Sequence, residues 1–238
     1  MSVLVLAGVE RALVSGSARF VLQIPALDLE AGEGLALVGP SGAGKSTSLD
    51  LAALALAPDR AERLVVRGVD AAALWARGAH DALAALRARA IGYVPQTGGL
   101  LPFLTVAENI ALTQRLAGRR EPSRILRLAE RLGIAAELDR PPAALSVGQR
   151  QRAAIARALA HRPALVVADE PTAALHPELA ADVFALLVSA CAEDGAALLV
   201  ATHDAEEARR AGLALRRVTP VPGEARSVVE PEPEPCPA

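Results

Sequence analysis

The fold expected of this chain follows from one segment, Gly39-Pro40-Ser41-Gly42-Ala43-Gly44-Lys45-Ser46-Thr47. It matches the pattern G-x-x-x-x-G-K-[ST] and lies between two apolar runs, 35–38 and 49–56, which predict a strand and a helix. Glycines let backbone N–H groups curve around a phosphate, and the start of the following helix favours negative charge. We therefore predict that residues 39–47 bind the phosphates of a nucleotide.

Two side chains of this loop carry specific chemistry. The Lys45 ammonium can reach the β- and γ-phosphates, and the Ser46 hydroxyl can ligate Mg²⁺. Lys45 is also the single lysine among 25 basic residues, the others being arginine. A bias towards GC-rich codons explains the arginines, but it does not explain why one lysine remains. A compact ammonium on a flexible stem fits a tight phosphate loop, whereas a planar guanidinium does not.

The composition is that of a globular protein. The 238 residues carry 25 basic and 27 acidic side chains and are 52% hydrophobic, which suits one large domain or a core with a subdomain. Because the charge is balanced, no basic surface and no nucleic-acid partner are expected. The cysteines, Cys191 and Cys236, are too few for a disulfide framework or a zinc site.

No stretch of the sequence approaches the ~18 apolar residues that a membrane-spanning helix needs. The first apolar run, at 3–7, lacks a basic flank and is shorter than the core of a signal peptide, so it predicts a strand. Any role at a membrane is therefore expected to depend on a partner protein.

Apolar runs alternate with helical stretches along the chain, which predicts an α/β fold. Strands are expected at 3–9, 20–29, 35–38, 90–94, 164–168 and 197–201, and helices at 49–56, 80–90 and 177–192. The first two strands predict an N-terminal antiparallel β subdomain. The mostly helical stretch from about 97 to 160 predicts a helical subdomain inserted between strands.

The last twenty residues differ from the rest of the chain. Residues 219–238 hold six prolines and four glutamates against one arginine, a composition typical of an extended, mobile segment. We therefore expect a folded domain at 1–218 and a disordered tail at 219–238.

Four polar residues follow predicted strands. Asp169 and Glu170 end the apolar run 164–168, where Asp169 can hold Mg²⁺ through a water and Glu170 can orient or deprotonate an attacking water. An Asp-Glu pair alone is usually a solvated turn, but the phosphate loop upstream favours the catalytic interpretation. Gln96 can sense the γ-phosphate or Mg²⁺, and His203 can donate a hydrogen bond to the γ-phosphate.

A second phosphate-binding helix start is expected at Leu145-Ser146-Val147-Gly148-Gln149, before the alanine-rich helix 153–160. Ser146 can cap that helix, and its hydroxyl together with nearby N–H groups can bind a phosphate. In isolation the pentapeptide would be only a helix cap. Because the chain already has one phosphate loop, a second suggests a nucleotide shared between two subunits.

In this order the motifs resemble those of ATP-binding-cassette (ABC) transporter ATPases, over residues 3–215. The family motifs are Walker A (39–47), the Q-loop glutamine Gln96, the signature (145–149), Walker B (165–170), the D-loop (173–176) and the switch histidine His203. The resemblance implies a P-loop ATPase core and a head-to-tail dimer, homomeric or heteromeric. Two ATP would lie between the Walker A loop of one subunit and the Ser146, Val147, Gly148 and Gln149 of the other.

The resemblance also implies integral membrane permease subunits, which would hold the chain at the cytoplasmic face of the membrane. The stretch 100–110 is similar to the subgroup that serves lipoprotein-release and macrolide-export transporters, which suggests an exporter or lipoprotein-release system. In the family the surface around 96–109 receives the coupling helix of the membrane subunit. The apolar stretch 100–103 would suit such a socket, and ordinary packing explains it equally well.

Three positions depart from the family pattern. Val147 stands in place of a glycine, and its β-branched side chain requires an ordinary backbone conformation there. His176 ends the D-loop in place of aspartate. The aromatic residue that stacks on adenine would fall near Ala12, which cannot stack, although Phe20 could supply a ring from another position. We predict slow hydrolysis and weak base selectivity.

Two other functions remain to be weighed against the transporter ATPase. Soluble ABC ATPases of DNA repair or translation generally have tandem cassettes or long coiled-coil insertions, and this chain has neither. A nucleotide-gated clamp that barely hydrolyses ATP would fit Val147 and His176, whereas Glu170 and His203 argue against it.

Overall fold

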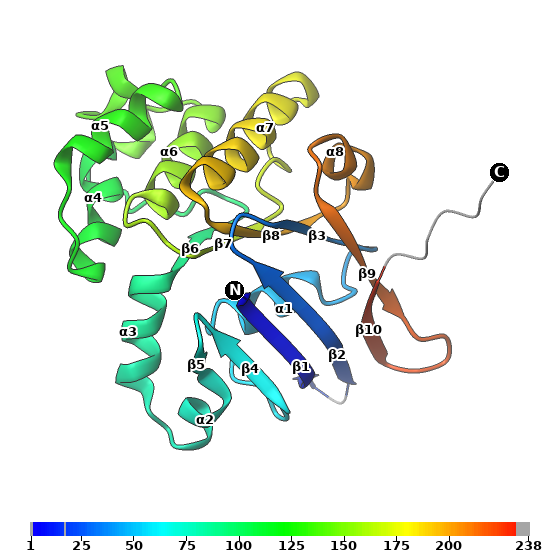
Figure 1. Ribbon diagram of the computed structural model, residues 1–238. Helices are drawn as coiled ribbons and strands as arrows, with labels where there is room; N and C mark the ends of the chain where they lie inside the picture. Colours follow the sequence, from blue (N-terminus) through cyan, green and yellow to red (C-terminus); the bar gives the residue numbers. More distant parts are fainter. Residues whose placement is uncertain (1, 17, 232–238) are drawn as a thin grey trace.

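The computed structural model describes residues 2–16 and 18–231. Within that range the strands form one mixed sheet in the order β5-β4-β1-β2-β10-β9-β3-β8-β7-β6 (Figure 1). The strands are β1 Ser2–Ser15, β2 Ala18–Glu30, β3 Gly34–Val38, β4 Arg63–Val66, β5 Val69–Asp70, β6 Ile91–Val94, β7 Leu165–Asp169, β8 Ala197–Thr202, β9 Ala214–Pro220 and β10 Arg226–Pro231.

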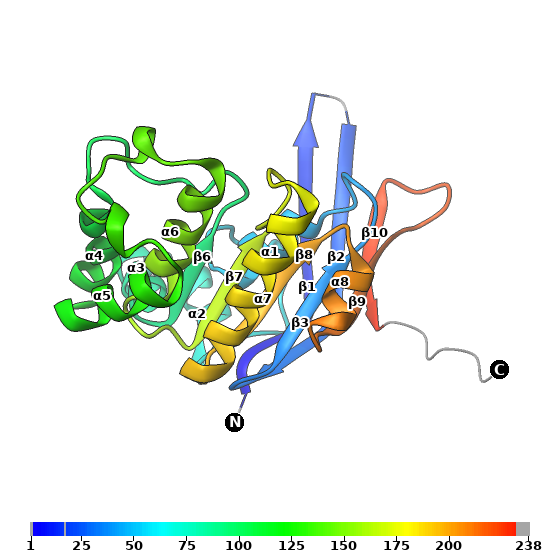
Figure 2. The ribbon, with the colours of Figure 1, turned by 90° about the horizontal axis from the view of Figure 1, so that it is seen from above.

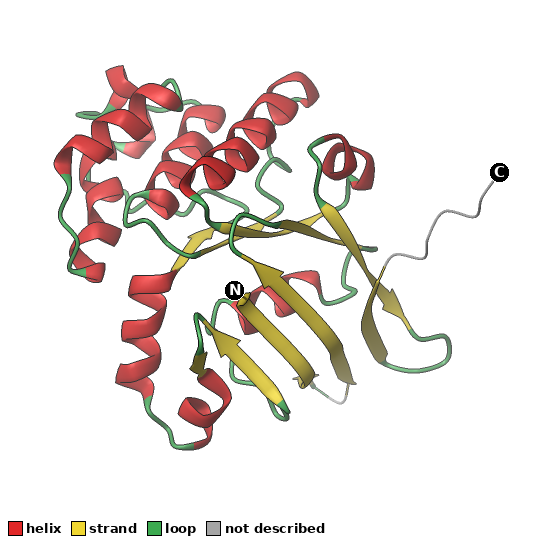
Figure 3. Cartoon of the chain, in the orientation of Figure 1, coloured by secondary structure: helices red, strands yellow, loops and turns green. Residues whose placement is uncertain are grey.

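Helices pack mainly around the part of the sheet formed by β3, β8, β7 and β6, as the red elements of Figure 3 show. They are α1 Lys45–Ala52, α2 Ala71–Ala76, α3 His80–Ala90, α4 Val106–Ala117, α5 Pro122–Arg131, α6 Val147–Leu159, α7 Pro177–Asp194 and α8 Ala205–Arg210, with short 3₁₀ turns at Ala135–Glu137 and Pro142–Ala144. The predicted α/β class, the N-terminal antiparallel strands and the inserted helical block are confirmed.

The parallel strands β3, β8, β7 and β6 form one end of the sheet, with helices on both faces (Figures 1 and 2). Successive side chains of a strand point to opposite faces. In β3, Ala36 and Val38 pack into the cluster that includes α6 and α7, whereas Leu35 and Leu37 pack into the cluster on the side of α1. Because both faces are buried, these strands are continuously apolar in sequence.

Helix α1 follows β3 through the glycine-rich loop and ends earlier than the predicted helix 49–56. Its last residue is Ala52, and Leu54 adopts a left-handed φ of 57°. The Leu56 N–H turns back to the Asp50 carbonyl at 3.1 Å. The apolar run 49–56 is therefore half helix and half turn, and Leu49, Leu51 and Leu54 are buried in both halves.

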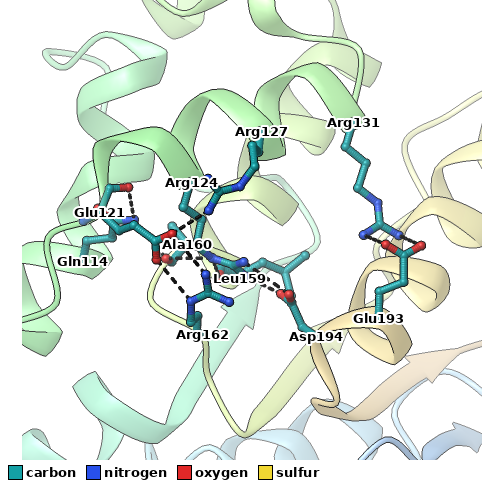
Figure 4. A network of polar contacts seen from close by, with 10 residues as sticks. All are labelled: Gln114, Glu121, Arg124, Arg127, Arg131, Leu159, Ala160, Arg162, Glu193 and Asp194. Atoms are coloured by element: carbon teal, nitrogen blue, oxygen red, sulfur yellow. Dashed lines mark hydrogen bonds and ion pairs between the residues drawn. The ribbon is translucent and has the colours of Figure 1, made fainter.

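Ion pairs tie the helical block of α4, α5 and α6 to α7 (Figure 4). Arg124 of α5 donates to the Leu159 carbonyl at the end of α6 (2.8 Å) and pairs with Asp194 at the end of α7. Arg131 donates to Glu193, one residue earlier in α7, at 2.6 Å. Since Arg124 is nearly buried, removing either member of its pair would leave an uncompensated charge.

The tail prediction for 219–238 is wrong for its first part. β10, Arg226–Pro231, lies between β2 and β9 and pairs with both, so the sheet continues well past residue 218. Ser227 and Val229 are buried, because alternate residues of β10 face the core. The many prolines and glutamates of this segment made the alternation of buried and exposed residues hard to recognise in the sequence. Residues 232–238 lie outside the described part of the chain.

No helix in the described residues is both long enough and apolar enough to span a membrane.

Candidate nucleotide-binding and catalytic site

The glycine-rich loop joins the end of β3 to the start of α1. A Cβ on Gly39 would lie 2.5 Å from the Val218 carbonyl oxygen of β9, so only glycine fits at that position. Gly44 caps α1 with a left-handed φ of 103° and no side-chain hydrogen bond. The first N–H groups of α1 therefore remain available for an acceptor that the loop encloses.

Lys45 is held by the loop itself. Its ammonium donates to the carbonyls of Gly39 at 2.9 Å and Pro40 at 3.1 Å, and it lies 3.9 Å from Glu170 Oε1. The side chain is only 6% exposed, so three oxygens compensate a nearly buried charge. The loop places one cation where phosphate oxygens would enter.

A hydroxyl and a carboxylate meet beside Lys45. Ser46, in the first turn of α1, donates to Asp169 Oδ1 at the end of β7 at 3.1 Å. Burial raises the pKa of Asp169, and the negative charges of Glu170 and Asp50 raise it further against the lowering effect of Ser46 and Lys45. Hard oxygen ligands with surplus negative charge fit Mg²⁺, which usually takes one or two carboxylates and otherwise uses water and phosphate oxygens.

Glu170 adopts an uncommon backbone conformation. Its φ is 40°, in the left-handed region that non-glycine residues rarely adopt, and its N–H donates to the Ala201 carbonyl at 2.9 Å. Such strain of ~1–3 kcal/mol tends to occur where function requires a side chain to be aimed. His203 follows β8, and its Nδ1 lies 3.8 Å from Glu170 Oε2.

Lys45, Ser46, Asp169 and Glu170 line one hollow of about 400 Å³. Its lining consists of Leu13, Phe20, Ser41, Gly42, Gly44, Lys45, Ser46, Thr47, Gln96, Asp169 and Glu170. The structure thus brings together the predicted phosphate loop, Gln96 and both carboxylates, although they come from separate parts of the chain. His203 contacts Glu170 without lining the hollow, and Ser146, Val147, Gly148 and Gln149 do not line it either.

Phe20 and Leu13 form the apolar side of the hollow. They are direct partners in the register of the β1–β2 hairpin. The Phe20 ring lies 3.5 Å from the position that a Cβ on Gly44 would take. Ala12 does not line the hollow, so the ring available to a bound base comes from β2. Leu13 was missed, and its pairing with Phe20 across the hairpin is the signal that could have found it.

Two polar residues that no sequence pattern marks, one in β6 and one in α1, meet beneath the start of the site. The Tyr93 hydroxyl donates to Asp50 Oδ1 at 3.2 Å. Burial raises the pKa of both side chains, and for Tyr93 the charges of Asp50 and Asp169 add to the rise. Nothing in their spacing marks these residues, because only packing of α1 against the sheet brings them together.

The signature residues start α6 with reciprocal hydrogen bonds. Ser146 Oγ accepts from the Gln149 N–H at 3.2 Å, and the Gln149 side chain accepts from the Ser146 N–H at 2.9 Å. Val147 is helical and 44% exposed, which confirms the ordinary backbone expected there. A Cβ on Gly148 would lie 2.6 Å from Leu179 Cδ2, so glycine lets α6 start close to α7.

Comparison with known proteins agrees with the motif order. The family model described as ABC transporter matches residues 22–173. The chain belongs to the ABC transporter family. Among curated ABC proteins, it is 42% identical to the lipoprotein-releasing system ATP-binding protein LolD 2 of Caulobacter vibrioides, over 87% of this chain and 90% of that one. It is 44% identical to LolD of Maricaulis maris, with the same coverage.

A solved ABC structure shows the same fold. The dimeric post-hydrolysis state of the ATP-binding cassette MJ0796, bound to ADP and Pi, matches with a TM-score of 0.79 and 29% identity, over 95% of this chain and 94% of that one. This ABC protein is accordingly an ATP-binding subunit with ATPase activity.

Proposed function

We propose that the chain pairs head to tail with a second ABC subunit around two ATP and drives a membrane transporter of the lipoprotein-release type. One observation carries the proposal: the hollow collects the phosphate loop, Gln96, Asp169 and Glu170, while Ser146 starts a helix outside it. Each nucleotide would then need Ser146 from the other subunit. The dimeric state of MJ0796 and the names of the LolD relatives support this assignment.

Within each site the phosphate loop would bind the substrate. The N–H groups at the start of α1 and the Lys45 ammonium would hold the β- and γ-phosphates of ATP. The Leu13 and Phe20 side chains would lie against the base. The two contacts come from different elements, α1 and the β1–β2 hairpin, so together they would orient ATP at both its phosphate end and its base end.

Ser46, Asp169 and Gln96 would hold Mg²⁺, which supplies positive charge to the β- and γ-phosphate oxygens. Glu170 would orient the attacking water and accept its proton, since its carboxylate lies between Lys45 and His203. His203 would donate a hydrogen bond to the γ-phosphate. The second subunit would add Ser146 and the N–H groups of Val147 and Gly148 on the opposite side.

The membrane partner would dock on the segment after Gln96. Leu100 packs against the core, whereas Phe103 is 77% exposed. Ordinary packing therefore accounts for Leu100, and a partner's apolar side chains would cover Phe103. Permease subunits bound there would keep the chain at the cytoplasmic face of the membrane. Affinity purification from solubilised membranes should recover an integral membrane protein, and Phe103→Asp should weaken that recovery.

The dimer is tested by Glu170→Gln. This variant keeps the shape of the side chain and removes the base, so ATP should remain bound and trap a dimer on size-exclusion chromatography. The same variant with ADP, and the unaltered chain with ATP, serve as monomeric controls. A Glu170→Gln chain that binds ATP and stays monomeric would contradict the proposed function.

A further inference from the structure

The segment that follows Gln96 contains two glycines whose carbonyls face α6. Gly98 and Gly99 have left-handed φ angles of 74° and 58°. The Gly98 N–H donates to the Pro95 carbonyl at 3.1 Å, which closes a turn directly behind Gln96. Two consecutive glycines can adopt many backbone conformations, so contacts from other elements must define the path of this turn.

Arg157, near the end of α6, supplies such contacts. Its Nη1 donates to the Gly99 carbonyl at 2.7 Å, and its Nη2 donates to the Gly98 carbonyl at 3.0 Å. Its own carbonyl accepts from the Thr113 hydroxyl of α4 at 2.7 Å. Burial lowers the pKa of the guanidinium, which nevertheless stays charged at neutral pH. A charged fork with two acceptors defines both position and direction.

Asn109 holds the next part of the same segment from a different helix. It is fully buried in α4, and its amide nitrogen donates to the Leu101, Leu104 and Thr105 carbonyls at 2.9–3.2 Å. Its oxygen accepts from the Leu101 N–H at 2.8 Å. The segment is therefore anchored twice, to α6 by Arg157 and to α4 by Asn109. Only the Arg157 anchor lies next to Gln96 and on the helix that Ser146 starts.

We propose that Arg157 is a positioning residue that makes Gln96 and the signature helix α6 move as one unit. Gln96 lines the hollow of its own subunit, whereas Ser146 would contact the nucleotide bound by the other, so the inference rests on the proposed function. Through Arg157, a displacement of Gln96 at one ATP displaces the Ser146 that serves the second ATP. In this way Arg157 of each subunit would help to couple the two sites of the dimer.

Hydrogen exchange tests the anchor without relying on activity. In Arg157→Met, the amides of 97–100 should exchange on the order of tenfold faster, because the local opening loses its charged hydrogen bonds. Arg152→Met is the matched control, since Arg152 lies on the same helix and donates instead to the Leu132 carbonyl at 3.3 Å. If Arg157→Met does not fold, Arg157→Lys undergoes the same measurement. Unchanged exchange at 97–100 overturns the proposal.

Turnover tests whether the anchor acts through Gln96. In Arg157→Met, kcat should fall on the order of tenfold with unchanged affinity for ADP, and Arg157→Lys should recover part of the loss. The double variant Gln96→Ala/Arg157→Met should be no slower than Gln96→Ala, and multiplied effects would overturn the proposal. If Gln96→Ala alone has full turnover, the role of Gln96 in the proposed function fails, while hydrogen exchange still decides the anchor.

Discussion

Helices α1 and α6 both begin where a phosphate could bind, yet the two starts are built in opposite ways. α1 follows Gly44 in a left-handed conformation, without any side-chain cap, and its first N–H groups face an enclosed loop. α6 follows Ser146, whose hydroxyl and N–H already bond with Gln149 in a reciprocal capping box. The first start has no side-chain partner for its N–H groups, whereas in the second Ser146 satisfies the Gln149 N–H and leaves those of Val147 and Gly148 for a ligand.

The starts of α1 and α6 also differ in their exposure to solvent. Lys45, in α1, is 6% exposed and lies among oxygens of Gly39, Pro40 and Glu170. Val147, in α6, is 44% exposed and lies outside the hollow. In the proposed dimer, each chain would use the buried start for its own nucleotide and would present the exposed start to the nucleotide of the other subunit. The difference indicates which half of the nucleotide site each chain keeps and which half it presents.

The largest expected effect is a loss of ATP binding when Lys45, at the buried start of α1, is replaced. Lys45→Ala should weaken ATP binding on the order of a thousandfold, about 4 kcal/mol, because no other cation is held in the loop by its carbonyls. Lys45→Arg should not restore binding, since a planar guanidinium does not fit between the Gly39 and Pro40 carbonyls. Isothermal titration with ATP measures both, with the exposed exchange Arg120→Lys as control. Strong ATP binding by Lys45→Arg would contradict the view that the start of α1 accepts only a compact ammonium.

At the exposed start, Ser146→Asp separates the cap from the phosphate contact. Aspartate caps a helix as well as serine does, so the free energy of unfolding should stay within about 0.5 kcal/mol. Its negative charge should repel a phosphate, and turnover should fall on the order of a hundredfold while ATP binding to the monomer persists. Ser146→Ala, which lowers stability by about 1 kcal/mol, is the companion variant. Full turnover in Ser146→Asp would mean that this start binds no phosphate.

A change of pH tests α6 without a mutation. His161, just after α6, is buried, and its Nε2 bonds to the Ile91 carbonyl at 3.1 Å. Burial lowers its pKa from 6.5 to about 4, so the folded chain favours the neutral ring. The associated stability is present above pH 6.5 and is lost as pH falls towards 4, roughly 2 kcal/mol of it by pH 5.

Urea unfolding at pH 7 and pH 5 measures this loss. His161→Gln is the control, since its amide can still donate to the Ile91 carbonyl but does not titrate in this range. A difference of stability between pH 7 and pH 5 that is the same in His161→Gln would assign the effect to other groups.

The smallest effect is expected where the base would lie. Phe20→Ala should raise the KM for ATP about fivefold, near 1 kcal/mol, by removing the ring beside Gly44. Phe20→Tyr should leave KM nearly unchanged. Because the hollow presents Leu13 and Phe20 as its apolar side, ATP and GTP should be hydrolysed at similar rates. Steady-state kinetics with both nucleotides checks these expectations, and a strong preference for ATP would show that polar groups read the base.

Most of the hollow could be predicted because each part has a local pattern. The loop 39–47 shows in its glycines, and Asp169 and Glu170 show as carboxylates after an apolar run. The parallel strands then bring these residues together, because their carboxyl ends share one edge of the sheet. The capping box at Ser146 is equally local, since its partner Gln149 lies one helical turn away.

What sequence patterns missed depends on contacts between distant segments. β10 became a strand because β2 and β9 offered hydrogen-bonding edges on both sides, which outweighed a composition typical of disorder. Arg157 looks like any arginine of a helix until its fork is seen on the Gly98 and Gly99 carbonyls.

Local sequence patterns therefore predicted the chemical groups of the site: one lysine in a phosphate loop, two carboxylates after a strand, and a second helix start with its own cap. Those features depend on neighbours within a few residues, where backbone geometry leaves little freedom. Only the tertiary structure decided that Phe20 borders the hollow, that β10 completes the sheet and that Arg157 holds the turn behind Gln96. These depend on strand register and helix packing, which only the folded chain defines.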